Sequence, residues 1–121
     1  MLFDINRLEE PIARIPHEAE FNMWRARLAE DQYQAIVDEL NLRVSGREVN
    51  TASWLPGGNW EGTVFWPIFK IACRENYESS ALFFGLIVWK FFMDRDDAWS
   101  FGRYEKAGVP IRGLTYFRIN V

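Results

Sequence analysis

The sequence has little of the chemistry on which most catalytic and metal sites are built. It contains a single cysteine, Cys73, and a single histidine, His17. One cysteine forms no disulfide within the chain and gives no metal-binding spacing, and its apolar neighbours predict a buried, inert thiol. Catalytic triads and histidine-rich zinc sites would all depend on His17, whose position at a predicted helix start favours a capping or solvent-exposed role. The sequence therefore selects no catalytic residue, no cofactor and no metal site.

The chain also lacks a hydrophobic run long enough to cross a membrane. Its most apolar stretch, ALFFGLIVWKFFM at 81–93, contains Lys90 and is shorter than the roughly 20 residues that a span requires. A helix that is apolar nearly all round belongs in the core of a soluble protein. The opening MLFDINRLEEP has acids and no apolar segment of the signal-peptide type. Together with the lone cysteine, these features predict a cytoplasmic protein without a membrane partner.

No strong excess of one charge is present either. The net charge is −3, which argues against a generic nucleic-acid binder. Residues 1–50 hold ten acidic and six basic side chains, whereas residues 51–121 hold seven and eight. A partner with a basic surface would fit the acidic half, although an ordinary solubilising surface explains the same distribution.

What the chain does have is apolar and aromatic surface, at 49% and 17% of its 121 residues. We expect one domain, 1–121, with a core of its own and a partly irregular leader over 1–16, where Pro11 and Pro16 interrupt any helix. The periodicity predicts helices over 18–28, 30–44, from Pro67 onward and 77–94, and strands over 48–54, 99–104 and 113–121. Within 30–44 the spacing predicts one buried face, made of Tyr33, Ile36, Val37, Leu40 and Val44, and Asn76 is the expected cap of the 77–94 helix. These elements predict an α+β fold: a small antiparallel sheet of about three strands, including a C-terminal hairpin, packed against three or four helices.

The stretch SWLPGGNWEGTVFWP, 53–67, is the densest in unusual residues. Gly57, Gly62 and Thr63 match part of a phosphate-binding loop, but its lysine is missing and Glu61 would repel a phosphate. A nucleotide-binding function is therefore excluded.

The same stretch places Trp54, Trp60 and Trp66 six residues apart around glycines. Tryptophan is enriched at interface hot spots, so an aromatic recognition loop is one interpretation. Inward packing at a corner between a strand and a helix is the other. We expect Trp54 and Trp66 to pack inward, and for Trp60 both alternatives stay open.

Asp94, Asp96 and Asp97 form an acidic cluster where the 77–94 helix ends. Negative charge there opposes the helix dipole, so the cluster calls for an explanation. A Ca²⁺ or Mg²⁺ site is one, but the run lacks the register of an EF-hand loop. A solvated turn is favoured, and the three acids also suit contact with a basic partner.

The C-terminal hairpin interleaves basic and aromatic side chains, which is one way to hold a single-stranded nucleic acid. They are Arg103, Tyr104, Lys106, Arg112, Tyr116, Phe117 and Arg118. No recognised RNA-binding motif accompanies them, and alternating exposed charges on a sheet are the simpler explanation.

The leading hypothesis is a small intracellular protein-binding module, a stand-alone inhibitor or adaptor that occupies a partner's surface. Its predicted partner-binding residues are Trp60, Glu61, Asp94, Asp96 and Asp97.

The alternative is a small-molecule-binding protein or minor hydrolase with a pocket between the 57–62 loop and the hairpin. Its predicted lining is Trp54, Asn59, Arg103 and Tyr104. A homodimer built through a sheet edge is a third hypothesis, and an enzymatic role is disfavoured but not excluded.

Overall fold

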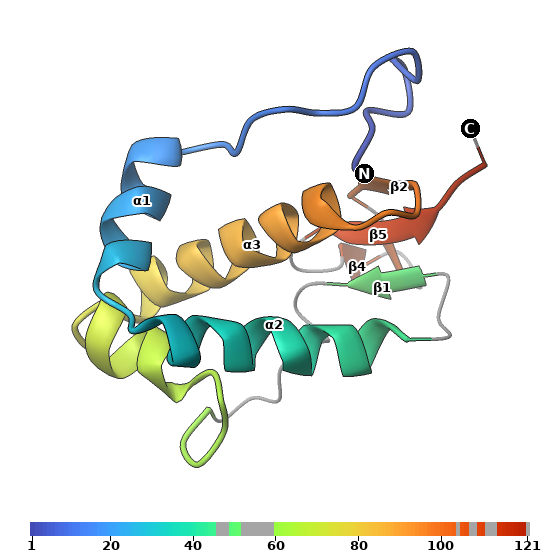
Figure 1. The fold of residues 1–121 in the computed structure, drawn as a ribbon. Helices are drawn as coiled ribbons and strands as arrows, with labels where there is room; N and C mark the ends of the chain where they lie inside the picture. The colour runs from blue at the N-terminus through green and yellow to red at the C-terminus, as the bar shows by residue number, and fades with distance from the viewer. Residues whose placement is uncertain (46–48, 52–59, 104, 107–108, 111–113, 121) are drawn as a thin grey trace.

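The computed structural model describes residues 1–45, 49–51, 60–103, 105–106, 109–110 and 114–120. Within them the chain forms three α-helices, one short π-helix and five short strands. The expected α+β class, with a small antiparallel sheet and helices, is confirmed. In Figure 1, α2 and α3 run from α1 and the π-helix on one side of the molecule to the sheet on the other.

Helices α1 (Glu18–Ala26) and α2 (Glu30–Val44) follow the predicted spacing. Both carry acidic residues in their first turn, where the positive end of the helix dipole favours them. Gln32 accepts a hydrogen bond from the Ala29 backbone at 2.9 Å, which satisfies one free N–H at the start of α2. The face of α2 that was expected to be buried is only partly so. Ile36, Leu40 and Val44 are buried, whereas Tyr33 and Val37 are half-buried.

Helix α3 (Tyr77–Asp94) is the central element of the core. Asn76 caps it as predicted, its side-chain oxygen accepting a hydrogen bond from Ser79 N at 2.9 Å. Its buried apolar residues lie on more than one side of the helix: Phe83, Phe84, Leu86, Ile87, Val88, Phe91 and Phe92. Together with residues of α1, α2 and the sheet they form one hydrophobic cluster. No helix in the described ranges combines the length and apolar character needed to cross a membrane.

The helix expected from Pro67 onward is instead a π-helix, η1 (Ile68–Ala72). Cys73 N donates to Ile68 O at 3.0 Å, a bond that spans five residues instead of four. Arg27, just after α1, donates to Ala72 O at 2.7 Å and so satisfies a carbonyl at the end of this short helix. Tertiary packing thus stabilises a backbone form that sequence periodicity does not predict.

The sheet has the strand order β1-β5-β2, with both pairs antiparallel. Its strands are β1 (Val49–Thr51), β2 (Trp99–Gly102) and β5 (Thr115–Arg118). Between β2 and β5 the chain forms a separate two-stranded ladder of β3 (Glu105–Lys106) and β4 (Val109–Pro110), which the sequence analysis did not predict.

The N-terminal residues lie against the outer edge of β2. Leu2 forms a parallel bridge with Trp99, and Phe3 N donates to Trp99 O at 2.8 Å. Leu2 and Phe3 are both buried, so the expected irregular leader begins inside the core. The chain then passes α3, where Trp89 Nε1 donates to Arg14 O at 3.2 Å, and reaches α1 (Figure 1).

Candidate functional site

A cleft of about 650 Å³ lies between the three α-helices and the turn that follows α3. This volume is within the usual range of small-ligand sites. Its apolar lining comes from Phe21 on α1, Val37 on α2 and Phe91 on α3. Its polar lining is Arg25, Tyr33, Asn41, Lys90, Asp94, Arg95, Asp96 and Asp97.

One end of the cleft is formed by an arginine stacked on a tyrosine. The Arg25 guanidinium carbon lies 3.8 Å from the centre of the Tyr33 ring, which holds it as a planar cation over an aromatic face. Arg25 also pairs with Glu30 at 2.7 Å, but the Glu30 side chain is 91% exposed, so solvent weakens this pair. Burial raises the pKa of Tyr33 to about 12, so its hydroxyl stays protonated at neutral pH. Among the described residues, this end therefore presents a cation stacked on a ring and paired with one solvent-exposed carboxylate.

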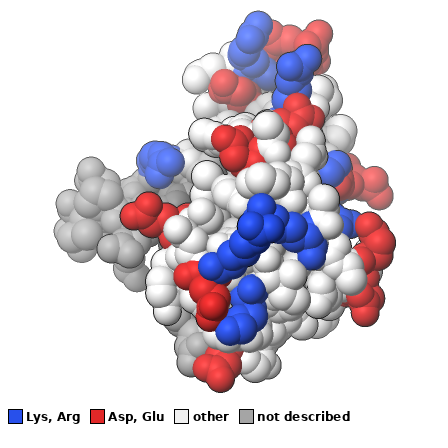
Figure 2. All heavy atoms as spheres, turned by 90° about the vertical axis from the view of Figure 1, so that its left-hand side faces the viewer, with Lys and Arg blue, Asp and Glu red and all other residues white. Residues whose placement is uncertain are grey.

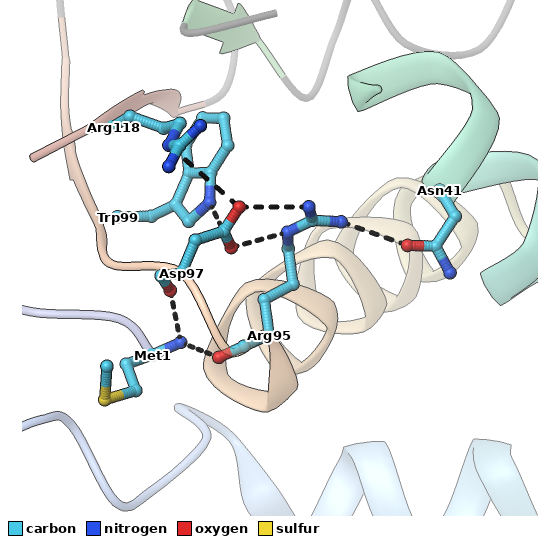
Figure 3. A network of polar contacts seen from close by, with 6 residues as sticks. All are labelled: Met1, Asn41, Arg95, Asp97, Trp99 and Arg118. Carbon is cyan, nitrogen blue, oxygen red and sulfur yellow. Dashed lines mark hydrogen bonds and ion pairs between the residues drawn. The ribbon is translucent and has the colours of Figure 1, made fainter. Parts of the chain in front are cut away.

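The opposite end is a turn built around Asp97 (Figure 3). Arg95 donates to both Asp97 carboxylate oxygens, at 2.8 and 3.1 Å, and Trp99 Nε1 donates to the same group at 2.8 Å. Arg118 approaches it at 4.0 Å. The hydrogen bonds from Arg95 are the main cause that holds the pKa of Asp97 below its usual value. Asp97 thus joins the end of α3 to β2 and β5.

Two further contacts extend this network. Arg95 also donates to Asn41 Oδ1 at 3.0 Å, which connects the turn to α2. The Met1 ammonium donates to the backbone oxygens of Arg95 and Asp97. Figure 3 shows these groups converging on the turn from α2, β5 and the N-terminal segment. Arg95 and Asp97 therefore already satisfy each other within the fold.

The acidic cluster predicted from the sequence lines the cleft, but its three members differ. Asp94 pairs with Lys90 at 2.8 Å, and Asp97 is only 22% exposed within its network. Asp96 is exposed, and within the described part of the chain it forms no ion pair. No group of three or more His, Cys, Asp or Glu side chains among the described residues is placed to hold a metal ion.

The structure does not bring Trp60 and Glu61 to this acidic cluster. Trp60 is half-buried, and its ring packs against Phe65 and Phe84, with centroids 6.2 and 5.6 Å apart. Phe84 precedes Asp94 by ten residues of α3, a separation of about 15 Å along the helix. The predicted partner-binding residues therefore belong to two separate surfaces.

The alternative pocket falls largely outside the described residues. Trp54, Asn59 and Tyr104 are not among them, and Arg103 is exposed. This pocket stays a prediction, as does the homodimer through a sheet edge.

The tryptophans divide into buried and half-buried groups. Trp24 and Trp99 are buried, whereas Trp60, Trp66 and Trp89 are half-buried. The sixth, Trp54, lies outside the described residues. The indoles are therefore not all sealed within the molecule.

Trp66 belongs to a row of rings that we call the aromatic row: Trp66, Phe69 and Tyr77. Centroids are 5.3 Å apart between Trp66 and Phe69, and 4.7 Å between Phe69 and Tyr77. Tyr77 is 80% exposed, the highest value among the exposed large hydrophobic residues in the described part of the chain. Sequence analysis missed Tyr77, because its place at a helix start gives no sign of the ring contact with Phe69.

The backbone beside the aromatic row departs from ordinary geometry twice. Arg74 and Glu75 have φ angles of +52° and +65°, consecutive left-handed residues where glycine is normally required. The π-helix η1 ends at Ala72, two residues before Arg74. Glu75 is held by Lys70 at 2.9 Å and by its own N–H, which donates to Phe69 O at 2.7 Å. Strained backbone and π-helical turns are both enriched at functional sites.

The charges on the face that includes α1 are interleaved. Figure 2 shows basic side chains near the middle of this face, bordered on several sides by acidic ones, with no broad area of one sign. This face therefore gives no support for steering by a single acidic field.

The two scarce residues lie outside the cleft lining. Cys73 is buried, and desolvation raises the pKa of its thiol, which disfavours a reactive thiolate. His17 precedes α1 with a φ of +52° and is exposed, but its side chain forms no capping hydrogen bond.

A scan against protein-family models, a search of curated proteins and a search of solved structures each found no match to this chain. Function must therefore be inferred from the geometry alone.

Proposed function

We propose that this chain is an intracellular protein-binding module that acts by occupying a partner's surface, as an inhibitor or adaptor does. The observation that carries the proposal is the exposure of Tyr77 at the end of the aromatic row. Tyrosine and tryptophan dominate binding hot spots because they bury a large, rigid surface with few rotatable bonds.

The surroundings of the row support the same function. Ile71 on η1 and Leu82 on α3 are also exposed apolar residues of this part of the chain. Between η1 and α3, Glu75 pairs with Lys70 at 2.9 Å and its N–H donates to Phe69 O at 2.7 Å, so contacts within the turn connect the two helices. Partner binding at a preorganised row would lose little conformational entropy.

The test compares Tyr77→Ala with a control of matched exposure. Leu42 on α2 is 74% exposed and lies on a different helix, so Leu42→Ala removes apolar surface elsewhere. Affinity capture with the wild type and with both variants should recover a partner that Tyr77→Ala loses and Leu42→Ala keeps.

Two readouts make the comparison decisive. The circular dichroism spectrum and thermal midpoint of Tyr77→Ala should match the wild type, since an exposed side chain contributes little to stability. Equal recovery of every partner by all three proteins would contradict the proposed surface. Phe69→Ala, which removes the middle ring, should reproduce the loss seen with Tyr77→Ala.

A further inference from the structure

The helix cleft is a second site, separate from the aromatic row, and its chemistry indicates a ligand class. Its floor is apolar, formed by Phe21, Val37 and Phe91. Its two ends carry opposite charges, Arg25 at one and Asp96 at the other, beside charged groups that already pair within the fold. A ligand that fills it should combine an apolar middle with charged ends.

The positive end is Arg25. Its guanidinium is already oriented on the Tyr33 ring, and its ion pair within the described part of the chain, with Glu30, is exposed to solvent. A planar guanidinium binds a carboxylate through two parallel hydrogen bonds. A ligand carboxylate can therefore displace or share Glu30 at low cost.

The negative end is Asp96. The neighbouring Arg95 and Asp97 bind each other, and Arg95 fixes this turn to Asn41. Asp96 lines the cleft with an exposed carboxylate that forms no ion pair among the described residues. The Met1 ammonium binds the backbone of the same turn and interacts electrostatically with Asp96 without forming an ion pair among the described residues, and it does not line the cleft.

The length of the cleft follows from α2. Tyr33, Val37 and Asn41 line it at successive helical turns, a span of about 12 Å along the helix. Arg25 stacks on Tyr33 at one end of this span, and Arg95, the neighbour of Asp96, binds Asn41 at the other. An α-amino acid, whose charges are adjacent, is too short to reach both. An extended chain of three residues spans about 10 Å between its free ends.

We propose that the cleft binds a short linear peptide of about three residues with both ends free. The peptide carboxylate binds Arg25, its ammonium binds Asp96, and an apolar central side chain packs on Val37 and Phe91. This site does not depend on the proposed protein-binding function.

The experiment titrates the full chain with the tripeptide Ala-Leu-Ala by isothermal calorimetry. Four forms are compared: free, N-acetylated, C-amidated and capped at both ends. Capping either end removes one charge-assisted contact and should weaken binding about tenfold.

Two variants assign the ends. Arg25→Gln should make binding insensitive to amidation while acetylation still weakens it, and Asp96→Asn should give the reverse. Lys70→Gln on η1 and Asp38→Asn on α2 make the same charge changes outside the cleft lining and should bind like the wild type.

Absence of binding by the free tripeptide would overturn the proposal. The proposal would also be overturned if the doubly capped tripeptide bound as tightly as the free one, or if Arg25→Gln and Lys70→Gln lost the same amount of affinity for the free tripeptide. If Arg25→Gln fails to fold, titration of the wild-type chain with the capped peptides still shows whether binding requires both charged ends. Tyr77→Ala should leave peptide binding unchanged, which separates this outcome from that of the proposed protein partner.

Discussion

The two ends of α3 differ in whether the aromatic residue there is buried and hydrogen-bonded or exposed to solvent. Beyond its C-terminal end, Trp99 is 1% exposed and its indole N–H is bound by Asp97, which is bound in turn by Arg95. At its N-terminal end, Tyr77 is 80% exposed and packs at a tilt against the Phe69 ring, with centroids 4.7 Å apart. The first arrangement is needed by the fold itself. The second leaves apolar surface available to another molecule.

The comparison shows why a cluster of conspicuous residues does not by itself mark a binding surface. Three aspartates in four positions suggest a binding surface when only the sequence is considered. In the structure, Asp97 pairs with Arg95 in the turn after α3, and Asp94 pairs with Lys90 on its own helix. Tyr77 gives no such indication in the sequence, although it is the more exposed group. Whether a side chain can bind another molecule depends on the contacts that it already makes within the fold.

The largest expected effect is at the C-terminal end, from Trp99→Ala. Its ring packs on Phe92 with centroids 4.8 Å apart, and truncating it leaves a large cavity in the core. The free energy of unfolding should fall by about 3–5 kcal/mol. Urea denaturation followed by far-UV circular dichroism measures it, and a change below 1 kcal/mol would contradict the assigned core role.

Asp97→Asn should cause the next largest loss of stability. The substitution keeps the shape but leaves Arg95 without its counter-charge, and the free energy of unfolding should fall by about 1–3 kcal/mol. Asp96→Asn is the matched control in the same turn and should change it by less than about 0.5 kcal/mol. Similar effects at both positions would mean that the network contributes no specific stability.

The same pair gives a pH dependence with a defined sign. The pKa of Asp97 is lowered in the folded state from an ordinary value of 3.8, chiefly by the hydrogen bonds from Arg95. Its contribution is therefore complete above that value and is lost as the pH falls through the lower folded pKa. The stability difference between wild type and Asp97→Asn should be constant at neutral pH and shrink in acid, as urea titrations at successive pH values would show.

Asn76→Ala should have an intermediate effect at the other end of α3. It removes the hydrogen bond to Ser79 N and should lower the free energy of unfolding by about 1 kcal/mol. Chemical denaturation would measure the loss, and Asn76→Ser, which keeps a capping oxygen, should recover most of it. No difference between the two substitutions would argue against the cap.

The smallest effect on stability should come from Tyr77→Ala, next to Asn76 in the chain. Because the ring is exposed, the free energy of unfolding should change by less than about 0.5 kcal/mol. Differential scanning calorimetry can measure both variants under one condition. A loss as large as that of Asn76→Ala would mean that Tyr77 serves the fold, and the comparison between the two ends of α3 would fail.

The sequence by itself predicted most of the secondary structure. The 3.6-residue periodicity of Ile36, Leu40 and Val44 located α2, and Asn76 located the start of α3, because helix periodicity and capping are local properties. The α+β class followed from the change to a two-residue period near the C-terminus. The π-helix was missed, since its bonding depends on packing and on Arg27 from another helix.

The candidate sites were predicted less well than the fold. The sequence identified the three aspartates that line the cleft, but not Arg25, Tyr33 or Asn41, which come from helices whose relative positions no local pattern gives. It singled out Trp66 but not the ring contacts that extend the aromatic row to Tyr77.

Sequence alone thus determined where helices and strands form and that the chain has an apolar core, because these depend on neighbours within a few residues. Only the tertiary structure decided which charges are satisfied and which remain available. Asp96 and Asp97 are adjacent and chemically identical, and they differ only because residues from β2, β5 and the end of α3 reach one carboxylate and not the other.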